Sequence, residues 1–467
     1  MDKLPLELVQ LILEAIQAGD DDALGFHATD NFRPDTSSFR NSVCNARLVS
    51  RMFSQASHAI FAQLLGHRRV RFTEAGLQDL QDISEAKALQ PHIRTLTFGM
   101  ASFNGLARLS TLPHILRHMH VEDWREQMLL LDFKECYQAQ ERLDEQSIKQ
   151  ILCEAFRRLP NLHNVLVIYG DHVDCRESHL KGWLPSYDQE AFRDAFDRYY
   201  GPRSSADYSL YHDHVKPFFI PAIFASLHEA RSRLKVLSLA FRGYEWKTTR
   251  VSTPAIKTIF WRLATDYNLP LSRFSNLRVF RSTVKIEPYE HDDRQDWVVL
   301  AKTIQDMPML EEIVLDLVAP TPVDAIGNRY LQNQISMGHY QRLASSAILK
   351  ALIARNIKYL TFNGAWFFSE DELATFISNQ SGTISSLTFL ETTVFQGSWS
   401  SLLTKLSVCS LPKLKNVTII DPYEVDLHRG YHNRRGVDLK ENISSVLPLS
   451  SLGYELAVTN VVAEAKD

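Results

Sequence analysis

Cysteine is scarce in this chain and is never paired by spacing. Five of the 467 residues are cysteines, and no two of them form a Cys-x-x-Cys motif. Disulfide-rich domains use regularly spaced cysteines and structural zinc sites use close pairs, so we expect neither kind of site. The thiols are predicted to be reduced and mostly buried: Cys44, Cys136, Cys153, Cys175 and Cys409.

Long apolar runs are also lacking, and the sequence predicts no secretory leader. The longest run, "FFIPAIFASL" from Phe218, contains Pro221 and is far shorter than the roughly 20 residues that cross a bilayer as a helix. The first residues carry neither the basic segment nor the apolar core of a secretory signal. These absences predict a protein of the cytoplasm and/or the nucleus with no membrane partner.

Neither sign of charge dominates. The 51 basic and 55 acidic residues are mixed along the chain and leave a net charge of -4. A protein that binds nucleic acid needs a dense basic face, so we expect no nucleic-acid partner.

Sequence motifs of common enzymes are missing as well. The chain has no P-loop, no dinucleotide-binding glycine motif, no His-Glu-x-x-His and no Gly-x-Ser-x-Gly. Two histidine pairs, His118 with His120 and His212 with His214, lack an identifiable third ligand. We therefore expect a protein that is not an enzyme, without catalytic residues, metal site or cofactor. An enzyme with a dispersed site stays open.

Helical patterns mark the beginning of the chain. "LPLELVQLILEAI", from Leu4, has apolar residues at helical spacing and Pro5 in the first turn, where a missing N–H costs nothing. A polar stretch over residues 19–41 predicts a loop, and the pattern resumes in "NARLVSRMFSQASHAIFAQLL" from Asn45. A unit of roughly 65 residues makes a thin core by itself, so we expect a partner surface to cover its apolar stripe.

"LPLELVQLILEAI" followed by "RLVSRMFSQASHAIF" resembles the F-box, especially its fungal form. F-box proteins dock this helical module onto the adaptor subunit of SCF-type (cullin-RING) ubiquitin ligases, and through the adaptor onto the cullin. The alternative is a plain N-terminal helical cap whose stripe packs on the rest of the chain. The resemblance implies an adaptor-binding surface at Leu4, Pro5, Leu8, Ile12, Leu48, Val49 and Phe53.

Beyond residue 66 a repeated pattern, apolar-x-x-apolar-x-apolar, suggests parallel strands. Most copies follow a helical stretch, so the chain forms either a closed doubly wound domain or an open solenoid. The motif resembles the leucine-rich repeat, although other residues, among them Ala365, Thr392 and Pro422, stand where that repeat has its Asn or Cys. The strand-like copies begin at Ile93, Leu116, Leu162, Leu234, Leu277, Leu310, Ile357, Ile384 and Leu414.

The predicted fold is α/β, with an N-terminal helical F-box at residues 1–66 and an irregular leucine-rich-repeat-like solenoid with parallel strands at residues 67–460. By these resemblances the protein is a substrate-recognition subunit of an SCF-type ubiquitin ligase, whose array binds the protein to be ubiquitinated. The alternative is a ligase-independent interaction scaffold that uses the array alone.

The connections between elements predict where a target binds. Links from helix to strand are short, whereas links that leave the strands are long, among them residues 171–217 and 319–339. Parallel strands point the same way, so the long links meet at one rim. A second interpretation is that the aromatic loop only covers the strand face. The predicted target-binding residues are aromatic: Trp183, Tyr187, Tyr199, Tyr200, Tyr208, Tyr211 and, on a strand, Tyr359.

Overall fold

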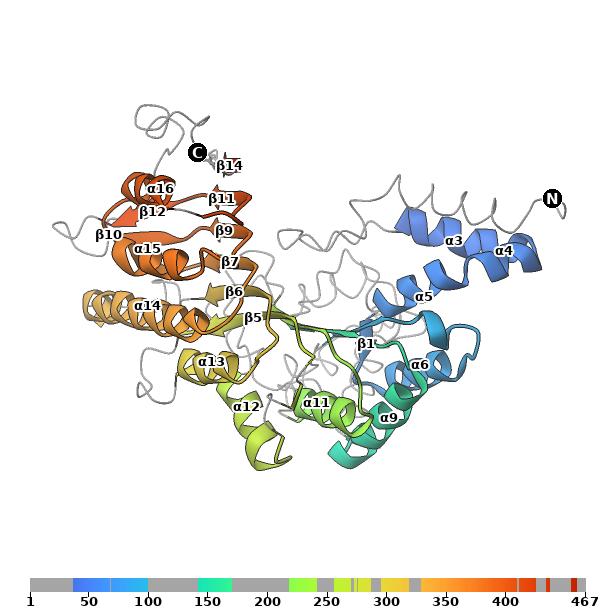
Figure 1. Ribbon diagram of the computed structural model, residues 1–467. Helices are drawn as coiled ribbons and strands as arrows, with labels where there is room; N and C mark the ends of the chain where they lie inside the picture. Colours follow the sequence, from blue (N-terminus) through green and yellow to red (C-terminus); the bar gives the residue numbers. More distant parts are fainter. Residues whose placement is uncertain are drawn as a thin grey trace, which may run out of the picture. The chain divides into compact units, whose positions relative to one another are not determined.

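The structure is a computed structural model, drawn in Figure 1. Packing divides the chain into two compact units, residues 1–234 with 240–254 and residues 235–239 with 255–467. Both units mix helices with parallel strands. The predicted domain boundary at residue 66 stays a prediction. The structure describes residues 37–67, 69–99, 142–169, 218–241, 256–269, 273–274, 276–286, 295–318, 329–409, 411–425, 434–436 and 455–459.

The first unit begins, in its described part, with three consecutive helices and continues with alternating strands and helices. Its strands pair in parallel, with Val70 beside Phe98 and Leu96 beside Val165. The elements are α3 (Ser37–Val49), α4 (Arg51–Ala56), α5 (His58–His67), β1 (Arg69–Arg71), α6 (Glu74–Glu85), η1 (Gln90–His92), β2 (Thr95–Gly99), α9 (Glu145–Arg158), β3 (Asn164–Tyr169) and α11 (Phe219–Glu229).

Close contacts hold this unit together. The rings of Phe72 and Phe219 stack with their centroids 4.2 Å apart. Glu229 of α11 forms ion pairs with Lys149 and Arg157 of α9, at 3.4 and 3.1 Å. Helix α5 approaches β2 so closely that a Cβ on Gly66 would stand 2.3 Å from the Thr95 carbonyl oxygen. A glycine is therefore required where α5 meets the first strands.

The second unit contains a large parallel sheet whose strands lie side by side in chain order. We call these seven strands the main sheet, and the helices between them lie on one of its faces, as Figure 1 shows for α13 to α16. Right-handed crossovers that always advance in one direction place every helix on the same side. The strands are β4 (Val236–Phe241), β5 (Val279–Lys285), β6 (Glu312–Val318), β7 (Tyr359–Gly364), β9 (Ser386–Leu390), β11 (Asn416–Ile420) and β14 (Glu455–Thr459). The helices are α12 (Ile256–Thr265), α13 (Asp296–Gln305), α14 (Arg329–Ile353), α15 (Glu370–Asn379) and α16 (Trp399–Val408).

The predicted strands are confirmed wherever the structure describes them; the copy from Leu116 lies outside the described residues. In the seven copies from Leu162 onward, the first, fourth and sixth positions are buried. In the six copies from Leu234 onward, these positions also come into register across the main sheet. The fourth position, for example, forms one fully buried row: Leu237, Phe280, Ile313, Leu360, Leu387 and Val417. The period in the sequence therefore corresponds to a continuous core between sheet and helices.

A second, short sheet was not predicted. Its order is β13-β12-β10-β8, and the main strands β7, β9 and β11 each turn a corner into one of its members. At each corner one residue has a positive φ: Gly364 (83°), Glu391 (52°) and Asp421 (48°). Each of these residues directly precedes the position at which the leucine-rich repeat has its Asn or Cys, where this chain has Ala365, Thr392 and Pro422. The short strands are β8 (Phe367–Ser369), β10 (Thr393–Gln396), β12 (Tyr423–Val425) and β13 (Arg434–Gly436).

Several predicted boundaries are wrong. The loop predicted over residues 19–41 gives way to helix α3 at Ser37, and the loop predicted over 319–339 gives way to α14 at Arg329. The resumed helical pattern breaks into three helices. Ser50 caps the start of α4, its hydroxyl accepting the Phe53 N–H at 3.3 Å, and Ser57 separates α4 from α5. Helix α12 was not predicted. Within the described residues, no helix combines the length and apolar character needed to cross a membrane.

Candidate functional site

Helices α3, α4 and α5, which we call the helical segment, enclose a small apolar core. Val43, Ala56 and Ile60 are its buried centre. Side chains from all three helices are packed against it: Ala46, Met52, Phe53, Phe61 and Leu64. The segment thus has an interior of its own, although a small one.

Arg47 ties the three helices together. Its guanidinium lies over the Phe61 ring, 4.1 Å from the centroid, and its Nη1 donates to the Ser54 carbonyl at 3.0 Å and to the Ser57 hydroxyl at 3.1 Å. Burial lowers the pKa of Arg47. Burial and the positive charge of Arg47 also lower the pKa of His58. Ring and hydrogen-bond contacts therefore hold this half-buried cation against the segment.

Two apolar side chains at the end of α3 stay uncovered. Leu48 is 85% exposed and Val49 is 58% exposed, although both belong to the apolar pattern that continues into the core. Phe53, predicted with them, is partly buried against that core. The other predicted adaptor-binding residues lie outside the described residues: Leu4, Pro5, Leu8 and Ile12.

Of the predicted target-binding residues, the structure describes Tyr359 alone. It begins β7 on the open face of the main sheet, the face opposite the buried rows, and is 50% exposed. Other apolar side chains of this face are more covered, with Val314 buried and Val236, Val279 and Leu390 half-buried. The remaining aromatic residues lie outside the described residues: Trp183, Tyr187, Tyr199, Tyr200, Tyr208 and Tyr211.

A polar cluster on the open face was missed from the sequence. Arg281 of β5 donates from Nη2 to Glu312 Oε1 of β6 at 2.7 Å. Thr283 Oγ1 and Asp316 Oδ2 lie 3.4 Å apart, and Asn363 of β7 stands beside Asp316 in the register. Burial raises the pKa of Asp316 to about 6, although hydrogen bonds from Asn363 and Thr283 and the charge of Arg281 act in the opposite direction. The signal available in the sequence was polar residues at alternate positions of three neighbouring strands.

Metal ligands and thiols can be placed only within the part of the chain that the structure describes. No three His, Cys, Asp or Glu side chains gather there in a metal-binding group, and the two histidine pairs fall outside it. Cys153 is buried and unpaired, and burial together with the nearby Glu229 raises the pKa of its thiol, which disfavours a reactive thiolate. Cys44 and Cys409 are half-buried.

The described surfaces that stand out are thus an exposed apolar pair on the helical segment and a polar open face on the main sheet. Comparison with known proteins adds no identity: no model of a protein family matches the chain, and none of the curated proteins searched matches it.

Proposed function

We propose that this protein is a substrate-recognition subunit of an SCF-type ubiquitin ligase. In this proposal residues 1–66 act as an F-box that binds the adaptor subunit, and through it the cullin. The array that follows binds the target protein. The observation that carries the proposal is the exposure of Leu48 and Val49 inside the motif "RLVSRMF".

Exposure of these two residues is costly unless a partner covers them. Burying a leucine or valine side chain is worth about 1.5–3 kcal/mol, and two adjacent ones make an apolar anchor of the kind that dominates interfaces. The neighbouring Phe53, Met52 and Leu64 satisfy the same pattern by packing inward. The exposed pair is therefore free to bind outward while the rest of the segment maintains the fold.

The array supplies a surface for the second role. Its helices lie on one face of the main sheet, so the open face presents side chains from neighbouring strands in fixed register. Tyr359 offers an aromatic ring there, and Arg281, Glu312 and Asp316 offer charged and polar groups. Such a surface can recognise a protein without taking part in chemistry.

The test uses the full-length protein and the purified SCF adaptor. We expect the wild type to co-purify with the adaptor and the double variant Leu48→Asp, Val49→Asp to lose it, because the anchor then carries two charges. Val408→Asp is the matched control, since Val408 is 82% exposed on α16. It removes a comparably exposed apolar side chain far from the motif in sequence.

The outcomes separate this proposal from its alternative. A wild type that fails to bind the adaptor rejects the ligase role and leaves the interaction scaffold, in which the array alone binds partners. A double variant that still binds, with an unchanged thermal melt by circular dichroism, shows that Leu48 and Val49 are not the anchor.

A further inference from the structure

One row of residues crosses the main sheet at the points where its strands begin. Each residue stands one position before its strand, and we call the set the entry row: Lys235, Arg278, Glu311, Lys358, Ser385 and Lys415. The row is linked by backbone hydrogen bonds. From Arg278 on, the N–H of each member donates to the carbonyl oxygen of the preceding member of the row, on the neighbouring strand, at 2.8, 2.8, 2.7, 2.7 and 2.9 Å. Strands in a sheet are about 4.8 Å apart, so these hydrogen bonds give the side chains a fixed spacing.

The entry row is basic although the whole chain is slightly acidic. Four of its six residues are Lys or Arg, and all four are exposed. The single carboxylate, Glu311, lies between two of them, 3.4 Å from Arg278 and 3.1 Å from Lys358. One carboxylate cannot neutralise four cations, so the row keeps a net positive charge at the N-terminal ends of the strands.

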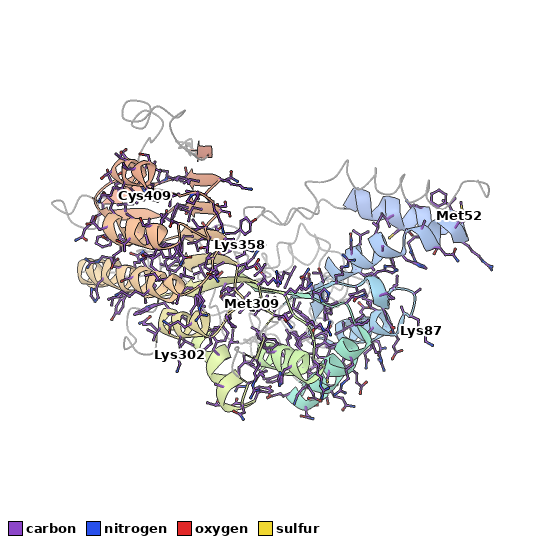
Figure 2. All side chains as sticks on the ribbon, viewed as in Figure 1. Met52, Lys87, Lys302, Met309, Lys358 and Cys409 are labelled. Carbon is purple, nitrogen blue, oxygen red and sulfur yellow. The ribbon has the colours of Figure 1, made fainter. Side chains whose placement is uncertain are left out.

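Two exposed apolar side chains lie beside this charge. Met309 is 47% exposed in the turn that leads to Glu311, and Tyr359 directly follows Lys358. Figure 2 labels Met309 and Lys358, which lie just before β6 and β7, and labels Lys302, which belongs to α13. Methionine, tyrosine and arginine are enriched in protein interfaces, whereas an edge that is only solvated needs no such neighbours.

We propose that the entry row, with Met309 and Tyr359, binds an acidic protein segment that also carries apolar residues. The inference rests on the proposed function only in identifying that segment as part of the ligase target. Charge complementarity indicates that the partner is negatively charged. The two exposed apolar side chains favour a protein segment over a polyanion without apolar groups. The net charge of -4 on the whole chain also disfavours a long polyanion such as nucleic acid, which would meet acidic surface beyond the row.

The test measures peptide binding to the full-length protein by fluorescence anisotropy. The probe is a short fluorescein-labelled peptide in which Asp and Glu alternate with Leu and Phe, and its twin has Lys at every acidic position. We expect the acidic probe to bind and the twin not to bind. The double variant Lys358→Glu, Lys415→Glu should weaken binding of the acidic probe about tenfold or more at low salt, and added salt should weaken the wild type.

The matched control reverses two exposed lysines on the helix side of the same unit, Lys302→Glu and Lys350→Glu. It carries the same change in net charge, so unchanged binding by this variant, together with retained binding by Lys358→Arg, Lys415→Arg, supports the entry row. The variant Lys358→Gln, Lys415→Gln serves if the charge reversal disturbs folding, and it should also weaken binding.

Three results overturn the proposal: equal weakening by the helix-side control, equal binding of the lysine twin, or displacement of the probe by single-stranded DNA as effective as by unlabelled peptide. Adaptor co-purification is measured on the same samples. A protein that binds the probe through the entry row but never binds the adaptor rejects the ligase function alone. One that binds the adaptor but not the probe rejects only the entry-row proposal.

Discussion

The main sheet and the helical segment both arise from apolar patterns in the sequence, yet the apolar residues of the two patterns are buried to different extents. In the main sheet every apolar position of the strand motif that the structure describes is buried, because the strand before and the strand after supply neighbours in register. In the helical segment Leu48 and Val49 are left exposed although Met52 and Phe53 pack inward. A repeated unit is completed by its own copies, whereas a small single unit leaves part of its pattern for another surface.

The largest expected effect breaks the main sheet. Phe362 of β7 is fully buried, and its ring meets those of Trp366, Phe368 and Phe389 at centroid distances of 5.1, 4.9 and 6.2 Å. Phe362→Ala should lower the free energy of unfolding by about 3–5 kcal/mol, measured by urea denaturation. Tyr359→Ala, on the same strand but half exposed, should cost about 1 kcal/mol or less. Equal losses would contradict the idea that burial in register distinguishes these positions.

The next effect tests whether the apolar residues at the beginning of the chain bind a partner. Leu8→Asp with Ile12→Asp, in the predicted first helix, should reduce adaptor affinity about a hundredfold or more, since anchors carry most of an interface's energy. The measurement is co-purification of the adaptor with the full-length variant. Persistent binding with a normal circular-dichroism melt would reject the F-box interpretation. Loss of the fold itself would favour the cap interpretation.

A smaller effect tests how closely helix α5 of the helical segment packs against β2. Gly66→Ala would normally stabilise a helix by about 1 kcal/mol. Here the new Cβ would stand 2.3 Å from the Thr95 carbonyl oxygen, so we expect a net loss of about 1–3 kcal/mol instead. Gly382→Ala meets no atom within 4 Å and is the control. A stabilised Gly66→Ala protein would show that α5 does not approach β2 this closely.

The smallest expected effect concerns the open face. The pKa of Asp316 is raised to about 6 from its usual 3.8, so the folded protein holds this proton more tightly than the unfolded chain does. The resulting stability is present below pH 4 and is lost as pH rises through 6. Asp316→Asn should remove that loss and be more stable than wild type at pH 8 by about 1 kcal/mol, since the site is half-buried. Urea denaturation at pH 4 and pH 8 checks it, and equal pH dependence of the two proteins would count against the raised pKa.

Much of the α/β organisation was predictable because strand and helix periods are local properties of the chain. The copies from Leu162 to Leu414 predicted β3 to β7, β9 and β11, and amphipathic stretches predicted α9, α11, α13, α15 and α16. The short sheet escaped because three-residue strands such as β8 contain too few positions to show a period. Its corners depend on a positive φ, which Gly364 suggests but Glu391 does not.

The candidate surfaces, too, were predictable only in part from the sequence. Residue identity was enough to select Leu48, Val49 and Phe53 as one set, because an apolar motif can be recognised along a line. Which of them stay outside could not be read there, since Ser50 ends the continuity of the helices and turns Phe53 into the core while Leu48 stays exposed. The polar cluster on the open face joins residues more than thirty positions apart in sequence, and the entry row joins residues that precede six different strands. They exist only once parallel pairing sets the register, because proximity between distant segments is a property of packing and not of local pattern.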